Sequence, residues 1–117
     1  MFTEIARVIP AGSLPDIDLP LTPLDPDQVV AGQPQVRTLP IHQSPQVSIG
    51  IWQHGIGVSR DIEADEVFIV LDGRATIEVE DGPTLHIGPG DIGLLPAGAR
   101  TTWTIHQPLR KAYVITP

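Results

Sequence analysis

One carboxylate stands out as a group that could do chemistry, because it opens an otherwise apolar segment. Glu66 precedes the run Val67 to Leu71 and, in a strand, would share one face with Phe68 and Val70. A carboxylate buried in this way must gain a partner or become protonated. We expect that partner to be an arginine, a histidine or the cation of a ligand. The candidates within the chain are Arg60, Arg100 and His54.

Aromatic side chains on the predicted strands are suited to line a pocket beside this carboxylate. Trp52 and His54 share a strand face, and Trp103 is in phase with Thr101 by the same rule. Indole rings and a carboxylate both attract positive charge, so together they would suit a cationic or amine-bearing ligand. The predicted ligand-binding residues are Glu66, Trp52, Trp103, His54, Phe68, Thr101, Arg100 and Tyr113.

The acidic segment before this strand raises a second possibility, a metal site. Asp61, Glu63 and Asp65 precede Glu66, and oxygen ligands of this kind favour magnesium, calcium or manganese. The alternative interpretation is a solvated acidic loop, which we favour for Asp61 and Glu63. Glu66 and His54 are the candidate ligands for a divalent metal.

The sequence contains no other recognisable catalytic device. No serine stands in a nucleophile elbow and no glycine-rich phosphate loop precedes a helix, so covalent catalysis has no obvious bearer. The chain has no cysteine, which excludes thiolate catalysis and thiolate metal sites. We therefore assign no catalytic residue, and the sequence leaves open whether the protein is an enzyme.

Length and charge restrict the class of protein. The chain has 117 residues, enough for one core, and its 7 basic and 14 acidic side chains give a net charge of -7. Nucleic acid or an anionic membrane would repel such a chain. The first residues show no basic segment followed by an apolar run, and no window approaches the length of a membrane-spanning helix. We expect a soluble, cytoplasmic protein.

Prolines separate the chain into two regions. They are frequent up to about residue 45, and Pro15, Pro20, Pro23 and Pro26 are too closely spaced for a helix or an inner strand. Residues 1–45 are therefore expected to form an extended arm and a lead-in segment, lying along the main domain or a neighbouring subunit. Within this region we expect one helical turn at 29–32 and a short strand at 35–39.

Residues 46–117 show the alternation and the glycine and proline punctuation of short strands, which indicate a sandwich or small barrel. Asp72-Gly73 and Asp81-Gly82 lie between apolar runs and predict tight hairpin turns. The strand that begins at Glu66 is apolar on both faces, so we expect its outer face to be covered, which favours a homodimer. The expected strands are 46–54, 66–71, 74–80, 83–87, 92–95, 100–106 and 110–116.

Two segments of this region carry a recognisable pattern. In the first, Glu66 is followed by six residues and then Gly73. In the second, Gly90 is followed by Pro96 and Gly98. These segments resemble the two halves of the cupin signature.

The resemblance is incomplete at the metal ligands. Thr101 and Ile105 stand where the cupin signature has a histidine and an asparagine, and no paired histidines precede Glu66. Metal-dependent cupins use three imidazoles and one carboxylate. Of that set, only the carboxylate remains.

Further segments narrow the resemblance. Gly50-Ile51-Trp52, Thr102-Trp103 and the run from Arg110 to Ile115 are similar to the cupin family named after (S)-ureidoglycine aminohydrolase. They also resemble the cupins associated with ethanolamine utilisation. The resemblance implies an all-β fold, a single-domain cupin double-stranded β-helix (jelly-roll barrel), often dimeric, with a site in the barrel mouth. It does not settle an activity, because one fold hosts many functions.

Three functions are compatible with these residues. The first, which we favour, is binding of a small polar metabolite in the barrel mouth, with Trp52 and Trp103 as walls and Glu66 as the polar anchor. The second is a metal-dependent, aminohydrolase-like enzyme acting on a ureido or amino compound. The third is a dimeric structural or regulatory protein whose barrel is filled by its own side chains.

Overall fold

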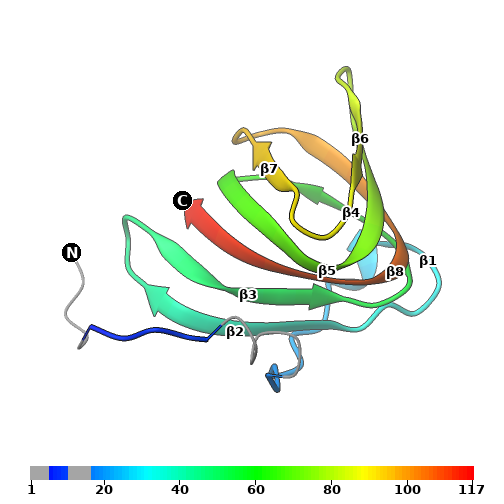
Figure 1. Ribbon diagram of the computed structural model, residues 1–117. Coiled ribbons are helices and arrows are strands. Elements are labelled where there is room, and N and C mark those ends of the chain that lie inside the picture. The colour runs from blue at the N-terminus through cyan, green and yellow to red at the C-terminus, as the bar shows by residue number, and fades with distance from the viewer. Residues whose placement is uncertain (1–5, 11–16) are drawn as a thin grey trace.

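A curled sheet of eight strands forms the body of the protein (Figure 1). The computed structural model describes residues 6–10 and 17–117. The described residues contain no helix of the length and hydropathy needed to cross a membrane. The all-β prediction is confirmed, and the curled sheet has the form of a jelly-roll barrel. The strands are β1 (Val29–Ala31), β2 (Val36–Gln43), β3 (Ser48–His54), β4 (Gly57–Ile62), β5 (Asp65–Val79), β6 (Thr84–Ile87), β7 (Ile92–Leu95) and β8 (Arg100–Thr116), with a 3-10 turn, η2 (Pro26–Gln28).

Strand β8 lies at the centre of the sheet. Along one edge its first half pairs with β4 and its second half with β3. Along the other edge it pairs with β5 over nearly its whole length, and β5 pairs in turn with β7 and β6. β1 and β2 extend the sheet beyond β4 and β3. The two long strands, β5 and β8, curve so that one face of the sheet becomes the interior (Figure 1).

The prediction of a hairpin turn at Asp72-Gly73 is wrong. β5 continues through both residues, and its register against β8 shifts between Val70 and Ala75 instead. Gly73 has a φ of 89°, and a Cβ atom there would collide with the carbonyl group of Pro108. Glycine therefore lets the long strand bend closely against β8 where the sequence suggested a reversal.

Of the other local predictions, one turn is confirmed, one helical turn is wrong, and one strand was missed. The turn at Asp81-Gly82 is confirmed, with Asp81 at a φ of 58°. The helical turn expected at 29–32 is wrong, because Val29–Ala31 form strand β1. A 3-10 turn, η2, lies just before this strand and has proline at its first helical position. Strand β4 was not predicted, and it supplies a wall of the barrel.

The segment 17–24 lies along the sheet and pairs with the edge of β2. The guanidinium group of Arg37 donates to the carbonyl oxygen of Leu19, which is only 4% exposed. The guanidinium group of Arg110 donates to the carbonyl oxygen of Ile17. This part of the predicted arm is thus bound to the barrel, and the predictions for residues 1–5 and 11–16 lie outside the described residues.

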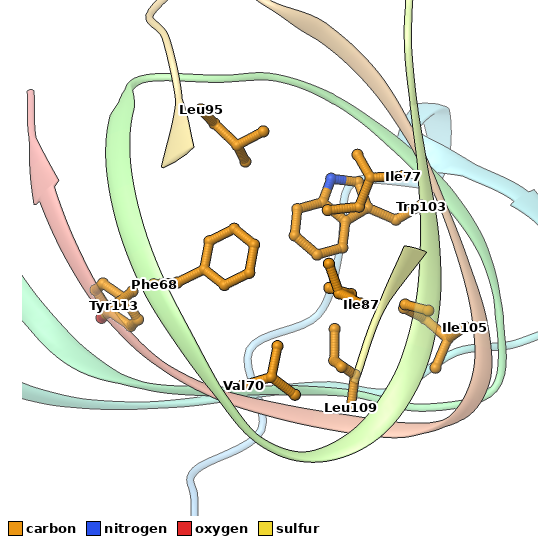
Figure 2. Close-up of a cluster of buried hydrophobic side chains, with 10 residues drawn as sticks. Phe68, Val70, Ile77, Ile87, Leu95, Trp103, Ile105, Leu109 and Tyr113 are labelled. Atoms are coloured by element: carbon orange, nitrogen blue, oxygen red, sulfur yellow. The ribbon is translucent and has the colours of Figure 1, made fainter. Parts of the chain in front are cut away.

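Apolar side chains from β5, β6, β7 and β8 form a buried cluster in the barrel (Figure 2). The rings of Phe68 and Trp103 lie 5.9 Å apart between their centroids. A Cβ atom at Gly93 would collide with the ring of Phe68, so this glycine allows the ring to lie directly against β7. The hydrophobic cluster consists of Phe68, Val70, Ala75, Ile77, Ile87, Leu95, Trp103, Ile105, Leu109 and Tyr113.

Candidate functional site

An ion pair between Glu66 and Lys111 lies at the centre of the site. Glu66 is in phase with Val70 on β5, and Val70 lies opposite Lys111 on β8, so both charged side chains point inward. Nζ of Lys111 donates to Oε2 of Glu66 at 2.6 Å, and the two side chains are 6% and 5% exposed. Each charge thus compensates the other inside the barrel. The partner of Glu66 is therefore none of the sequence candidates, Arg60, Arg100 and His54.

Three aromatic rings surround the ammonium group of Lys111. Its Nζ atom lies 4.5 Å from the ring centroid of Trp52, 4.8 Å from that of Phe68 and 4.7 Å from that of Trp103. A cation at such distances over ring faces is stabilised electrostatically. The aromatic faces that the sequence offered to a ligand cation therefore already hold a cation of the protein.

Glu63 is a second buried carboxylate. It is 9% exposed, and its Oε2 atom accepts hydrogen bonds from the hydroxyl of Thr101 at 2.6 Å and the indole N–H of Trp103 at 3.1 Å. The bonds hold the indole ring in place beside the ion pair. The interpretation of Glu63 as a solvated loop residue is wrong, because two donors on β8 take the place of solvent.

His54 is fully buried at the end of β3, and both of its ring nitrogens have partners. Nδ1 lies 2.7 Å from the carbonyl oxygen of Gly55, and Nε2 lies 2.8 Å from the hydroxyl of Ser59 on β4. Because a carbonyl oxygen can only accept, Nδ1 carries the proton. Burial lowers the pKa of His54, the bond to Gly55 partly offsets this, and the charge of Lys111 lowers the pKa further. The imidazole is therefore neutral near neutral pH, with Nε2 as an acceptor.

A cavity of about 350 Å³ opens beside these groups, bounded by side chains of β2, β3, β4, β5 and β8. Trp103 and Tyr113 belong both to its wall and to the hydrophobic cluster, so the barrel interior is part core and part cavity. The polar and aromatic groups that it presents to a small molecule include Trp52, Ser59, Asp61, Glu66, Lys111 and Tyr113.

Burial raises the pKa of three acidic groups at the cavity. Desolvation raises the pKa of Glu66, Lys111 opposes the shift through its charge and its hydrogen bond, and the charges of Glu63 and Asp61 add to it. Desolvation also raises the pKa of Asp61, with a further increase from Glu63. The pKa of Tyr113 rises mainly through burial. The cavity therefore disfavours additional negative charge.

The structure distributes the predicted ligand-binding residues over four places. Four of them line the cavity: Trp52, Glu66, Trp103 and Tyr113. His54 is fully buried behind Ser59, and Phe68 lies in the hydrophobic cluster with its ring toward Lys111. Arg100 and Thr101 line a neighbouring groove of about 760 Å³.

The residues present do not fit a bound divalent metal. Over 6–10 and 17–117, no three His, Cys, Asp or Glu side chains lie close enough together to hold one. Oε2 of Glu66 is bonded to the ammonium group of Lys111, whose charge would repel a metal ion at the same place. Nε2 of His54 is bonded to Ser59. The two candidate ligands from the sequence are thus engaged elsewhere.

Sequence reasoning missed Lys111 and Ser59. Lys111 is in strand phase with Leu109 and Tyr113, which would have indicated an inward position, although lysine is rarely buried. It is also the only lysine of the chain. The contact of Ser59 with His54 joins β3 to the unpredicted strand β4, so nothing in the local pattern pointed to it.

Comparison with protein families finds a match over most of the chain. A model described as the EutQ-like cupin domain matches residues 42–113, from β2 into β8. No match was found among curated proteins. The resemblance to cupins is confirmed by this match to the EutQ-like cupin domain. Membership of the family named after (S)-ureidoglycine aminohydrolase is not confirmed.

Solved structures share the fold. The Clostridium difficile EutQ protein is 22% identical, with a TM-score of 0.68, covering 89% of this chain and 83% of that one. A cupin superfamily protein from Desulfitobacterium hafniense is 19% identical, with a TM-score of 0.62, covering 70% of this chain and 77% of that one. A DUF861 family protein from Thermotoga maritima is 30% identical, with a TM-score of 0.51, but covers only 54% of this chain and 73% of its own.

Lys111→Met should lower the free energy of unfolding by about 3 to 5 kcal/mol, because it leaves the carboxylate of Glu66 buried without its partner. The double variant Lys111→Met with Glu66→Leu should recover much of this loss, since no charge is then left uncompensated. Urea denaturation near neutral pH measures the free energy of unfolding of both variants. If Lys111→Met were as stable as the double variant, Lys111 would not be compensating the buried charge of Glu66.

His54→Gln should flatten the pH dependence of stability between about pH 7 and about pH 5. The pKa of His54 is lowered from 6.5 in the folded state, so in this window the unfolded chain binds the proton more readily. The wild type therefore loses stability as the pH falls, and the variant lacks this contribution. Urea denaturation at a series of pH values measures the slopes. His86→Gln, at an exposed histidine, is the control, and equal slopes in all three proteins would contradict the prediction.

Proposed function

The chain belongs to the EutQ-like cupin domain family, and we propose that it binds a small polar metabolite in the barrel cavity. The observation that carries this proposal is a cavity of about 350 Å³ with a buried ion pair in its wall. Small-molecule sites combine apolar walls with a few fixed polar groups, and Trp52 and Trp103 supply such walls here.

The fixed charges favour one chemical class of ligand. Since the aromatic faces already hold Lys111, the ligand binds through polar contacts with the Glu66–Lys111 pair, with Asp61 and with the hydroxyl of Tyr113. This set contains both donors and acceptors, and the cavity disfavours added negative charge. A neutral or zwitterionic metabolite that carries both kinds of group, such as an amino acid or a ureido compound, fits these requirements.

The other two functions have less support. Aminohydrolase chemistry of the metal-dependent kind needs a donor set that the described residues do not assemble. A filled barrel would leave no room beside the hydrophobic cluster, whereas the cavity shares two residues with it. The resemblance to the (S)-ureidoglycine aminohydrolase family remains the reason to include ureido compounds among the candidate ligands.

A thermal-shift screen of amino acids, ureido compounds and polyols should identify a compound that stabilises the wild type. A ligand at about 100 times its dissociation constant raises the free energy of unfolding by about 2.7 kcal/mol. Glu66→Gln should abolish that stabilisation, because it removes the charge that holds Lys111. Glu78→Gln, at an exposed glutamate of the same strand, should retain it. A compound that stabilises the wild type and Glu66→Gln equally would place the ligand elsewhere.

We also propose that two copies pair through the outer face of β5, β7 and β8. Two neighbouring rows of aliphatic side chains cross these three strands, and Leu94 and Ile92 are 75% and 66% exposed. Monomeric proteins rarely expose a large continuous apolar patch, so a second copy would bury it. The rows are Leu94, Val67 and Val114, and Ile92, Ile69 and Ala112.

Leu94→Glu should convert a dimer to a monomer, because it places a charge at the most exposed residue of the apolar patch. Sedimentation velocity at several protein concentrations measures the change. Thr84→Glu, at an exposed position of β6 outside the patch, should leave the mass unchanged. A wild-type protein that sediments as a monomer throughout, or a Leu94→Glu dimer, would contradict the proposal.

A further inference from the structure

Ser59 is a buried nucleophilic group that metabolite binding does not use. Its Oγ atom lies 2.8 Å from Nε2 of His54. The side chain is only 5% exposed, yet it forms part of the cavity wall, so a molecule inside the cavity would meet it. The pair joins two consecutive strands, β3 and β4, and is therefore held by the sheet.

The neighbouring carbonyl group fixes the direction of this hydrogen bond. Gly55 accepts from Nδ1 of His54, which leaves the lone pair of Nε2 facing Ser59. The hydroxyl of Ser59 therefore donates to a neutral imidazole. A nucleophile that donates to a base, with the base oriented by a third group, is the arrangement used for nucleophilic catalysis. The carbonyl group of Gly55 is the third group here.

The same cavity contains a fixed positive charge. Lys111 lines it together with Ser59, and the charge of Lys111 reaches far enough to lower the pKa of His54. The ion pair with Glu66 and the three aromatic rings hold the ammonium group in place. A prepositioned positive charge stabilises an oxygen atom that becomes negative during a reaction. Lys111 opposes the upward pKa shift of Glu66 in the same way, so close to its ammonium group it offsets the acidic side chains that elsewhere disfavour negative charge.

We propose that Ser59 is a nucleophile, with His54 as its general base, in acyl transfer from small esters that enter the cavity. Oγ of Ser59 attacks the ester carbonyl carbon while its proton passes to Nε2 of His54. The bond to the leaving alcohol then breaks, and Nε2 returns the proton to the leaving oxygen, which produces an acyl-serine and an alcohol. A water molecule, deprotonated by Nε2 in the same way, releases the carboxylic acid and restores Ser59. The inference rests on an open cavity, as the proposed function does, but not on which metabolite binds.

The experiment uses p-nitrophenyl acetate and the full chain. We expect a burst of one nitrophenolate per chain, and peptide mapping should locate one acetyl group on Ser59 as an ester that hydroxylamine removes. Acetylation of Lys111 would give an amide that resists hydroxylamine. Labelling confined to Lys111 or to any other residue would overturn the inference, and so would the absence of a burst.

Variants test the roles of the two side chains. Ser59→Ala should abolish the burst, and His54→Gln should slow acylation by about 10² to 10⁴-fold through loss of the general base. Ser44→Ala, which removes a hydroxyl in the turn between β2 and β3, should react like the wild type. Because either site variant can reduce stability, the mapped label on the wild type decides between the outcomes.

Thermal-shift measurements on the same preparation separate this inference from metabolite binding. A metabolite that stabilises the protein, with no acetyl group on Ser59, would overturn acyl transfer and leave the binding proposal in place. Acetylation of Ser59, with no metabolite that stabilises the protein, would support acyl transfer and count against the binding proposal.

Discussion

The buried ion pair between Glu66 and Lys111 is the interaction on which the interior of this barrel depends. It joins the two longest strands, β5 and β8. Its ammonium group also lies against the rings of Trp52, Phe68 and Trp103. Lys111 therefore contacts both the charged wall of the cavity and the aromatic side chains of the interior. A lysine provides a positive charge, whereas a catalytic metal also provides open coordination positions. The barrel thus keeps a positive charge at its centre but offers a small molecule hydrogen-bonding groups in place of coordination.

The fold was predictable where local patterns and tertiary structure agree. Alternating apolar residues and regular turns predicted an all-β barrel, and the two cupin segments predicted its family at the level that is now established. Local signals failed at Asp72-Gly73, because pairing with β8 overrides the turn preference of those two residues and bends β5 instead. They also failed at β4, whose exposed Arg60, Asp61 and Ile62 conceal the alternation of a half-buried strand.

The site was predictable only for residues whose strand phase identifies them. Strand phase singled out Glu66, Trp52 and Trp103 as pocket residues, and all three line the cavity. The contacts of Lys111 and Ser59 depend on which strands become neighbours and in which register, and the sequence does not encode that information locally. Chemistry in this barrel therefore arises from cross-strand pairs, which a search for contiguous motifs does not detect.

The central place of β8 has a consequence for the way the protein folds during synthesis. β8 pairs with β3, β4 and β5, and it follows all three in the sequence. Until it emerges from the ribosome, these three strands lack their shared partner and expose unpaired backbone edges. Such edges are prone to associate with other chains, and pairings between distant segments form slowly. Nascent chains of this protein should therefore be a target for chaperones that shield strand edges during translation.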